Sequence, residues 1–464
     1  MTTLTFWGAT GTTTGSRFLL ELYDQRFLIE CGMFQGPKEN RMRNWDRFPV
    51  KPATIDRVIF THAHFDHTGY FPKFCKEGFK GKAHCTYATQ EFCKLLFLDS
   101  AHLQEEDARW ANKKGFTRHK PAKPLYTTAD AEKSLNHLSP LQYGEDLYLD
   151  GDIRIKLKDA GHILGSGLVD IKAHTGKESK KIVFSGDLGR PSKRFLRDPT
   201  QVFNVDYLVI ESTYGNRLHD NKNPVEKLVR VIKESVARGG VLVIPSFAIG
   251  RTQNLLYVIR ELEESGRIPA LPVYIDSPMA IDATEVFEKR ISDMNIASRV
   301  SRINGVDIFR PKNLNICTST EASKAINDIK KDAIIIASSG MVTGGRILHH
   351  MIHRLPDEKN TVLFIGYQAQ GTRGRTIVEK AETVKIHGRQ IPIKAKIESI
   401  QGFSGHADYN EILAWLTGFN KAPEKTFVVH GEPESSQAMA DHIKSNLGWD
   451  VTIPEFGQSF ELDL

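Results

Sequence analysis

The chain has 464 residues, of which 40% are hydrophobic and 25% are charged, and its formal net charge is +6. This composition is typical of a folded protein of two or three domains, and it excludes disordered and collagen-like chains. No apolar run approaches the roughly 20 residues that span a bilayer, and the N-terminus lacks a secretory signal pattern. Five scattered cysteines without a C-x-x-C pair do not predict a disulfide framework, so we expect a protein of the reducing cytoplasm.

The first part of the chain predicts short strands mixed with helices. Apolar residues at helical spacing predict a helix over 91–113. Strands are expected within the segments 4–9, 18–24, 26–32, 57–60, 153–162, 167–173, 180–189 and 206–213. Polar residues directly follow several of these strands, where loops on a rigid scaffold usually carry the chemistry.

The middle of the chain predicts a second kind of unit. Helices are expected over 224–240 and 251–267, and short β-branched runs predict strands at 241–246, 272–278, 333–340 and 361–368. Alternation of this kind favours a parallel sheet that is covered on both faces. Strands followed by histidine return near 394–408 and 425–432. We therefore expect an α/β domain over 209–390, inserted into a domain that is formed by 1–208 and 391–464.

The segment His62-Ala63-His64-Phe65-Asp66-His67 is the strongest chemical signal in the sequence. It places four candidate metal ligands within six residues, directly after a predicted strand. Residues two apart in an extended loop point the same way, so His62 and His64 can share one ion, and Asp66 and His67 can serve a second. The alternative is a set of helix-capping and surface residues.

Two nearby ions need further ligands, and the chain offers three candidates that each follow a predicted strand: His162, Asp187 and His430. Alone, each of them is typical of an ordinary loop or turn residue. The repeated pattern of strand, small residue and then histidine or aspartate favours a metal role. Local basic stretches at 113–123, 190–197 and 371–375 are interpreted either as solvated surface or as parts of a nucleic-acid groove.

With these motifs in place, the chain resembles the metallo-β-lactamase superfamily and, within it, the β-CASP family of nucleic-acid nucleases. The H-x-H-x-D-H signature at 62–67 resembles the superfamily, and Glu211, His406 and His430 resemble motifs A, B and C of the β-CASP branch. The segments 244–253, 338–346 and 366–375 resemble its inserted domain. The resemblance covers essentially the whole chain. It implies an α/β fold in which a metallo-β-lactamase αββα sandwich carries an inserted parallel-sheet β-CASP domain.

The resemblance also implies two zinc ions and a set of catalytic residues. The first ion would be bound by three histidines, the second by one aspartate and two histidines, and one aspartate would bridge both: His62, His64 and His162; Asp66, His67 and His430; and Asp187. His406 would act as general acid on the scissile phosphodiester, and Glu211 would orient it. Asp66, His406 and Glu211 are thus the expected catalytic residues.

Two details of the motifs bear on this resemblance. The family usually has aspartate where this chain has Glu30, in Glu30-Cys31-Gly32, and that residue supports the metal loop from behind. RNA-directed members have histidine at motif C, as His430 here, whereas DNA-directed members have an apolar residue. The expected substrate is single-stranded RNA.

The inserted domain is expected to act as a lid over a cleft that binds the RNA. Serine hydroxyls, backbone N–H groups and guanidinium groups bind phosphate, and a tyrosine ring can stack on a base. The candidate substrate contacts are Ser246, Arg251, Ser339, Tyr367, Arg373 and Arg375. Turn geometry for the glycines and an interdomain ion pair for Arg251 are the alternatives.

The expected function is zinc-dependent hydrolysis of RNA that leaves a 5′-phosphate and a 3′-hydroxyl. Internal cleavage is favoured, and trimming from the 5′ end is left open. The alternatives are a DNA nuclease of the same family, a non-catalytic RNA-processing scaffold and a hydrolase of small molecules. A homodimer and the identity of the native metal are also left open, because manganese or iron could occupy a mixed site of histidine and carboxylate.

Overall fold

The structure of the chain is a computed structural model. It describes residues 2–115, 120–175, 178–219, 223–295, 297–298, 301, 304–366 and 368–464. The chain divides into two compact units: unit 1 comprises Met1–Leu218 and His406–Leu464, and unit 2 comprises His219–Gly405. Both unit limits lie C-terminal to the domain limits expected from the sequence, after 208 and after 390, which remain a prediction.

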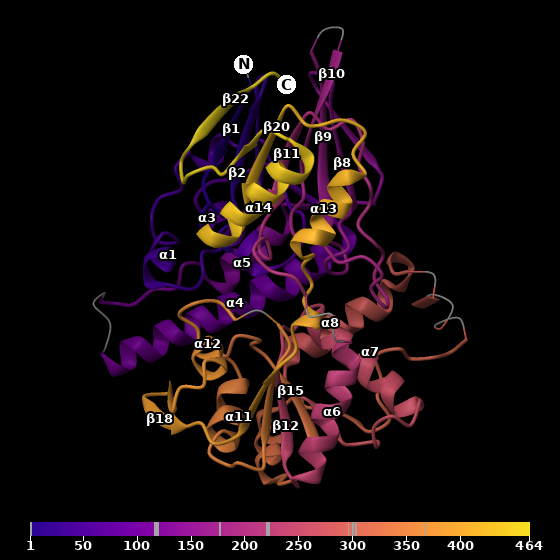
Figure 1. Cartoon of the computed structure of the whole chain (residues 1–464). Coiled ribbons are helices and arrows are strands. Elements are labelled where there is room, and N and C mark those ends of the chain that lie inside the picture. Colours follow the sequence, from indigo (N-terminus) through magenta and orange to yellow (C-terminus); the bar gives the residue numbers. More distant parts are fainter. Residues whose placement is uncertain are drawn as a thin grey trace. The chain divides into compact units, whose positions relative to one another are not determined.

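Unit 1 contains, within the described residues, two seven-stranded sheets (Figure 1). The first has the spatial order β22 (Ser459–Leu462), β1 (Thr2–Phe6), β2 (Phe18–Leu22), β3 (Gln25–Ile29), β4 (Arg57–Ile59), β5 (Lys82–Thr86) and β6 (Leu138–Leu141). The second has the order β21 (Val451–Thr452), β20 (Lys425–Val429), β11 (Tyr207–Glu211), β10 (Glu178–Phe184), β9 (Gly167–Thr175), β8 (Ile153–Asp159) and β7 (Asp146–Leu149). The two ends of the chain therefore meet where β1 pairs with β22.

Alternation along the strands builds the core between these sheets. On β8, Ile153, Ile155 and Leu157 are fully buried, whereas the residues between them are partly exposed. This period of two places one row of side chains on the inner face of the sheet. Phe6 of the first sheet and Phe427 of the second belong to the same hydrophobic cluster, with ring centroids 5.1 Å apart. The two sheets thus pack face to face.

Helices cover the outer faces of this sandwich. On the second sheet, Ile412 of α13 (Tyr409–Thr417) and Met439 of α14 (Pro433–Leu447) pack with Leu208 and Val428 of the strands. On the first sheet, the long helix α4 contacts β5 and β6, and α5 packs against both α3 and α4: α3 (Phe71–Lys76), α4 (Tyr87–Lys114) and α5 (Thr128–Leu135). The connections also hold the short helices α1 (Lys38–Met42), η1 (Pro52–Thr54) and α2 (Phe65–Thr68). The predicted αββα sandwich and the helix expected over 91–113 are confirmed.

Unit 2 contains, in its described residues, a six-stranded sheet whose neighbouring strands pair in parallel. Its order is β14 (Leu314–Ile316), β13 (Val273–Ile275), β15 (Ala333–Ala337), β12 (Val241–Pro245), β16 (Thr361–Phe364) and β19 (Lys396–Ser399). The central strand β12 is buried along its whole length and contacts both α6 (Pro224–Ala237) and α11 (Ile347–Arg354). The parallel sheet predicted for the inserted domain is therefore confirmed.

The rest of unit 2 surrounds that sheet. Its helices include α7 (Arg251–Glu264), α8 (Pro278–Lys289), α10 (Thr320–Ala325) and α12 (Arg373–Val378), with the short turns η2 (Ile291–Asp293), η3 (Ile326–Asp328) and η4 (Gln401–Phe403). A separate hairpin is formed by β17 (Thr383–Ile386) and β18 (Arg389–Pro392). In the part of the chain that the structure describes, no helix has the length and apolar character needed to cross a membrane.

Candidate metal centre

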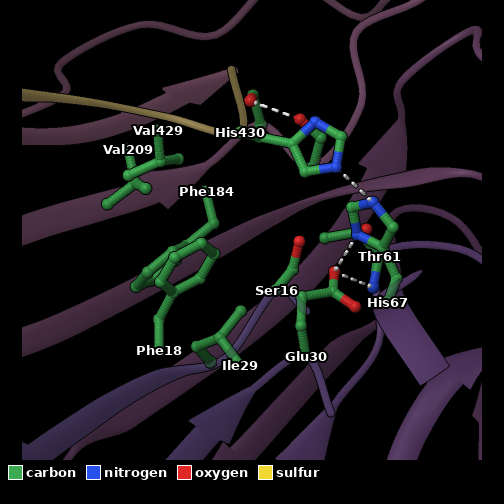
Figure 2. A pocket seen from close by; sticks show the side chains of 12 residues that line it. Ser16, Phe18, Ile29, Glu30, Thr61, His67, Phe184, Val209, Val429 and His430 are labelled. Atoms are coloured by element: carbon green, nitrogen blue, oxygen red, sulfur yellow. Dashed lines mark hydrogen bonds and ion pairs between the residues drawn. The ribbon is translucent and has the colours of Figure 1, made fainter. Parts of the chain in front are cut away.

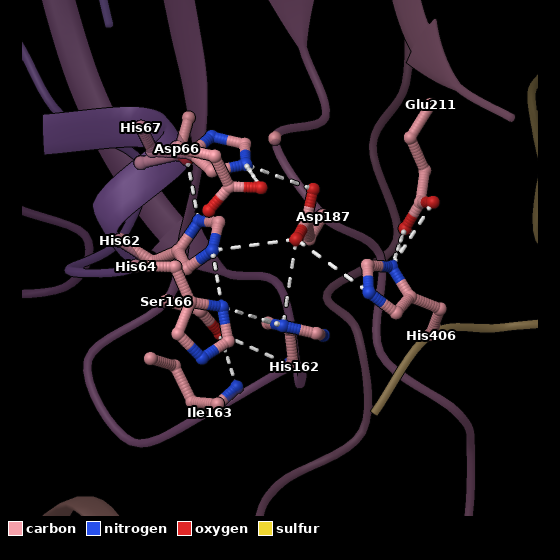
Figure 3. A network of polar contacts seen from close by, with 12 residues as sticks. His62, His64, Asp66, His67, His162, Ile163, Ser166, Asp187, Glu211 and His406 are labelled. Carbon is pink, nitrogen blue, oxygen red and sulfur yellow. Dashed lines mark hydrogen bonds and ion pairs between the residues drawn. The ribbon is translucent and has the colours of Figure 1, made fainter. Parts of the chain in front are cut away.

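Polar side chains gather in unit 1 at one edge of its strands. His62 lies three residues beyond the end of β4, Asp187 follows β10, and His430 follows β20 directly. Both β10 and β20 run parallel to β11, which lies between them. Because the carboxyl ends of parallel strands share an edge of the sheet, the loops after them meet there. His62 and Asp187 lie next to each other there (Figure 3), and His430 also lies beside Asp187.

Four side chains form the first cluster at this edge: His62, His64, His162 and Asp187. The Nδ1 atom of His64 lies 3.0 Å from Nε2 of His62 and 3.3 Å from Nε2 of His162. The Oδ2 atom of Asp187 lies 3.3 Å from Nε2 of His62 and 3.5 Å from Nε2 of His162. Ligand atoms about 2.0–2.1 Å from a tetrahedral zinc ion are separated by roughly 3.4 Å. The spacing of the four atoms thus fits one zinc ion.

A second cluster consists of Asp66, His67 and His430. The two histidine Nε2 atoms lie 3.1 Å apart, and Oδ2 of Asp66 lies 3.5 Å from Nε2 of His430 and 3.9 Å from that of His67. The Oδ1 atom of Asp187 approaches this group, at 3.3 Å from Nε2 of His67. One carboxylate therefore faces both clusters, one oxygen to each, which is the arrangement of a bridging ligand.

The electrostatics of the site favour donors that can bind a cation. Burial lowers the pKa of His64 to about 3 and holds the pKa of His162 well below the ordinary histidine value. Burial opposes the charged form of Asp187, but the surrounding histidines, led by His430, keep its pKa well below the usual range. In His67 the same burial penalty is outweighed by the charges of Asp187 and Asp66, so its pKa is raised well above the ordinary value. The first cluster therefore holds neutral imidazoles beside an ionised carboxylate, as metal binding needs, whereas a cation bound at the second cluster would displace the proton of His67.

Neighbouring side chains orient the histidines of both clusters. Thr61 Oγ1 lies 3.0 Å from Nδ1 of His62, and Thr213 Oγ1 lies 3.1 Å from Nδ1 of His430. Contacts of this kind at the second ring nitrogen select the tautomer and the ring orientation of a metal-binding histidine. They leave Nε2 of each ring directed at the cluster. The two threonines were not expected from the sequence, because Thr61-His62 is an unremarkable pair and Thr213 lies 217 residues away from His430 along the chain.

Glu30, which the resemblance assigns to the support of the loop at 62–67, contacts residues of that loop and the residue before it. Its Oε1 atom accepts the backbone N–H of Thr61 at 2.9 Å and lies 3.7 Å from Nδ1 of His67. Its Oε2 atom and Nδ1 of His67 are buried without a hydrogen-bond partner, as is Oγ of Ser16. These three groups line a cavity of about 10 Å³ between the sheets, shown in Figure 2. The Glu30 side chain thus binds the backbone of the residue that precedes His62. The role of Glu30 toward the metal remains a prediction.

His406 and Glu211 form a pair beside the two clusters (Figure 3). Nδ1 of His406 lies 3.0 and 3.1 Å from the two oxygens of the Glu211 carboxylate, and its Nε2 lies 3.8 Å from Oδ2 of Asp187. Glu211 is fully buried and also accepts the N–H groups of Leu188 at 2.6 Å and of Thr213 at 3.2 Å. These contacts hold the carboxylate in one position. It therefore fixes the His406 ring with Nε2 directed toward the metal clusters.

The residues expected to contact substrate lie in unit 2 and make contacts within that unit. Arg251 donates to the carbonyl of Ile365, and Ser246 is buried next to Thr252. Ser339 Oγ lies 2.9 Å from Thr343 Oγ1. These three residues therefore hold the loops that follow β12, β15 and β16, and their contact with substrate remains a prediction.

The two arginines of the glycine-rich segment 371–375 behave in the same way. Arg373 donates to the carbonyls of Lys385 at 2.8 Å and Thr343 at 3.0 Å, and Arg375 pairs with Glu379 at 2.6 Å. Tyr367, the expected stacking residue, lies outside the described residues. Residues 116–119 of the basic stretch at 113–123 also lie outside them.

Three sequence families match the chain in consecutive segments. The metallo-beta-lactamase superfamily matches residues 13–230, the Beta-Casp domain matches 252–377, and the Zn-dependent metallo-hydrolase RNA specificity domain matches 390–454. The last description names zinc and RNA for that family.

Named relatives match along most of the chain. Ribonuclease TTHA0252 of Thermus thermophilus is 35% identical over 452 residues, which cover 97% of this chain and 98% of that protein. The RNase J-like protein of Methanocaldococcus jannaschii is 31% identical and covers 94% of each chain. The transcription termination factor FttA of the same organism is 31% identical over 91% of this chain, which spans 65% of that longer protein.

Among solved structures, a protein of unknown function from Enterococcus faecalis V583 has a TM-score of 0.55 at 13% identity, and it covers 99% of this chain and 100% of its own. This likeness concerns the fold alone. The matches in sequence extend over nearly the full length of two relatives at more than 30% identity. The chain therefore belongs to the metallo-β-lactamase superfamily and, within it, to the β-CASP family of RNA nucleases.

Proposed function

We propose that the chain is a metal-dependent ribonuclease that hydrolyses phosphodiester bonds of single-stranded RNA with two zinc ions. The observation that carries the proposal is the convergence of seven metal-binding side chains next to the His406–Glu211 pair. The names of the relatives, a ribonuclease, an RNase J-like protein and a termination factor, support RNA as the substrate. Internal cleavage is the favoured mode. Cytoplasmic location and a homodimer remain predictions from the sequence.

The donor set supports zinc in this role. Five of the seven side chains are histidines, and imidazole together with carboxylate suits zinc. His62 and His67 bring nitrogen atoms within 3.0–3.1 Å of a neighbouring histidine nitrogen, deep in the protein. In the first cluster, neutral rings directed at one another bring lone pairs together, and a bound cation would relieve their repulsion. In the second cluster, a cation would take the place of the proton that His67 holds beside His430. The residues present therefore fit a pair of divalent ions, with Asp187 shared between them.

Divalent cations in the two clusters would supply a hydroxide near neutral pH and positive charge for the phosphate oxygens. The residues of the chain then act on the leaving group. Glu211 holds Nδ1–H of His406, so that the ring can carry a second proton on Nε2. As a new P–O bond forms and the bond from phosphorus to the 3′-oxygen breaks, that proton passes to the 3′-oxygen. The products are one strand with a 3′-hydroxyl and one with a 5′-phosphate.

Burial divides the residues of the site between structure and chemistry. His62, Asp187 and Glu211 are at most 2% exposed, whereas Asp66 and His406 expose 21% and 17% of their side chains. The buried groups hold position, and the two more exposed groups can meet a substrate. This division supports the assignment of His406 as general acid and of Asp66 as a ligand that substrate can approach.

Matched oligonucleotides test the proposal directly. Zinc-loaded wild-type protein is expected to cut a 5′-labelled single-stranded RNA, to leave 5′-phosphate ends, and to cut DNA of the same sequence much more slowly, since His430 favours RNA. His406→Ala should retain zinc and lose roughly 10²- to 10⁴-fold in kcat, because one general acid contributes about that much.

Several outcomes would contradict the proposal. RNA that stays intact with fully zinc-loaded protein would point to an RNA-processing scaffold, and faster cleavage of DNA would point to a DNA nuclease. Turnover of a chromogenic β-lactam without RNA cleavage would point to a hydrolase of small molecules. An RNA with a blocked 5′ end separates internal cleavage, which continues, from trimming at that end, which stops.

A further inference from the structure

His406 is the first residue at which the chain resumes unit 1 after unit 2. Its backbone is held there by the loop that carries Asp187: Gly189 forms an isolated antiparallel bridge with His406, and the N–H of Ala407 donates to the carbonyl of Leu188 at 2.8 Å. The two loops run side by side for only these few residues. Glu211 orients the ring, and any further contact between these two segments restrains the backbone that carries it.

The side chain of Arg190 supplies a restraint at that place. Its Nε atom lies 3.0 and 3.1 Å from the two oxygens of Glu411, and its Nη2 atom lies 2.9 Å from Oε1. The pair is about three-quarters buried, with 24% and 20% of the two side chains exposed. Forked contacts between guanidinium and carboxylate fix both distance and orientation.

Glu411 is at the same time part of the cap of α13. Its Oε2 atom accepts the N–H of Asp408 at 3.0 Å, and Asp408 in return accepts the N–H of Glu411 at 3.0 Å. The cap residue Asp408 lies two residues after His406, and this reciprocal cap fixes the start of the helix. Arg190 therefore joins the Asp187 loop to the rigid end of the segment that presents His406.

We propose that the ion pair of Arg190 and Glu411 is a positioning device for His406, which holds the general acid at its working distance from the metal clusters. The inference rests on the proposed function, because it assigns the pair to the same reaction. Arg190 belongs to the basic stretch 190–197, for which the sequence left open a nucleic-acid groove. Its contacts favour a role within the site over a contact with RNA.

Lys193, in the same basic stretch as Arg190, also contacts a loop of the site. Nζ of Lys193 donates to the carbonyls of Gly161 at 2.9 Å and His162 at 2.8 Å. Lys193 thus holds the loop that carries one expected ligand, and Arg190 holds the segment that carries the general acid. Two residues of the basic stretch 190–197 thus tie the Asp187 loop to other parts of the site: Lys193 to the loop of His162 and Arg190 to the start of α13.

The test uses two substrates that differ in their need for an acid. RNA has a poor leaving group and needs a proton on its 3′-oxygen, whereas bis(p-nitrophenyl) phosphate releases p-nitrophenolate, which leaves without one. Arg190→Met and Glu411→Gln are expected to lower kcat on RNA by roughly 10- to 100-fold with KM within twofold, because displacement by about 1 Å costs rates of that order. Turnover of bis(p-nitrophenyl) phosphate and the zinc content should stay near wild type. Arg190→Lys should recover part of the loss.

The chain offers a matched control in Lys76→Met. Lys76 contacts Asp130 at 2.8 Å, and Asp130 is likewise the carboxylate of a helix cap, that of α5. Loss of that pair should leave kcat on RNA unchanged. Glu411→Gln is the variant that preserves the fold, since glutamine can also serve in such a cap.

The outcomes separate the positioning role from the proposed function. Wild-type kcat on RNA in Arg190→Met and Glu411→Gln would overturn the positioning role and leave the ribonuclease intact. An equal loss on both substrates, or a loss that follows the melting temperature, would overturn it as well, since the pair would then be purely structural. Zinc-loaded wild-type protein that does not cleave RNA would overturn the proposed function and this inference with it.

Discussion

At the scale of single residues, Asp187 is the side chain on which the two clusters depend together. Its two oxygens face different groups of histidines, and the charge of those histidines holds its pKa well below the usual range. Asp66 faces only the second cluster. Loss of Asp187 should therefore weaken metal binding at both clusters, and loss of Asp66 should weaken it at the second cluster alone.

Substitution of Asp187 by asparagine is expected to reduce bound zinc at both clusters, whereas Asp66→Asn should reduce it at the second alone. Asparagine keeps the shape but removes the negative charge that offsets the divalent cations. RNA cleavage should fall by at least about 100-fold in Asp187→Asn, since even supporting residues of metal sites cost up to that much. Metal analysis of the purified variants by mass spectrometry measures the difference. Equal zinc content in both variants would contradict the bridging role.

His84 illustrates a titratable residue outside the metal centre. It is 4% exposed, its Nε2 atom lies 3.4 Å from Nη1 of Arg57, and burial, followed by the charge of Arg57, lowers its pKa to about 4. Above the ordinary value of about 6.5, the ring is neutral in both folded and unfolded chains. Between that value and 4 only the unfolded chain binds the proton, so the folded state loses stability as the pH falls.

The variant His84→Gln should lack this pH dependence. The difference in unfolding free energy between wild type and variant is expected to move against the wild type by about 3 kcal/mol as the pH falls from 7 to 4, because each pKa unit corresponds to about 1.4 kcal/mol. Urea unfolding with a chelator present measures it, and the metal-binding histidines cancel because both proteins contain them. A difference that is constant with pH would show that His84 is not held neutral by the fold.

At the scale of elements, the metal loop is positioned by its close approach to the end of β3. The N–H of Cys31 donates to the carbonyl of His67 at 2.8 Å, and the N–H of Ser16 donates to that of Asp66 at 2.9 Å. A Cβ atom on Gly32 would lie 1.6 Å from the carbonyl oxygen of Asp66 and 2.8 Å from the nitrogen of Ser16. Only glycine fits at position 32, between the backbone of Ser16 and that of Asp66 in α2.

Gly32→Ala should therefore displace the loop that carries Asp66 and His67. We expect weaker zinc binding, by roughly 10- to 100-fold, and a lower melting temperature, because the loop has to shift to remove the overlap. Gly344→Ala is the control, since a Cβ atom there would meet no heavy atom within 4 Å. Competition with a fluorescent zinc chelator measures the affinity. Wild-type affinity in Gly32→Ala would mean that the loop adapts without cost.

At the scale of the whole molecule, all seven expected ligands belong to unit 1, although they come from both of its chain segments. His430 joins residues from the first segment, so the metals would link the beginning of the chain to its end. A ligand that binds only the folded state stabilises the part of the molecule that contains its site. Unit 2 contains none of the seven.

Zinc removal is therefore expected to act on unit 1 alone. Hydrogen exchange should rise after chelation in the segments around 61–68, 160–166 and 185–190, while β12 and β15 of unit 2 keep their protection. With zinc far above its dissociation constant, binding contributes about 4 kcal/mol, which corresponds to a shift of roughly 7 °C in the melting temperature of a unit of this size. Mass spectrometry of proteolytic peptides measures the exchange. Equal deprotection of β12 would contradict the confinement of the metals to unit 1.

Local sequence patterns were sufficient to predict many of the strands and the first group of candidate metal ligands. Alternation in β8 and the apolar run of β12 predicted strands correctly, because periodicity reflects which side chains are buried on each face. The cluster at 62–67 was recognisable because its candidate ligands are close in sequence, and motifs of the family indicated the distant partners. The ion pair of Arg190 and Glu411 was not predicted from the sequence, although Asp408 and Glu411 have the spacing of a helix cap. A cap is visible in sequence, but the arginine that pairs with it comes from a distant loop.

The sequence by itself determined the types of elements, the parallel sheet and the kinds of metal-binding groups, since these follow from side-chain chemistry over a few neighbouring residues. Only the tertiary structure decided which atoms face each other. The placement of β19 beside β16, the two-sided position of Asp187 and the contact of Glu30 with Thr61 depend on strand pairing between segments far apart in the chain. Such pairing is set by the packing of the whole core, which a local pattern does not encode.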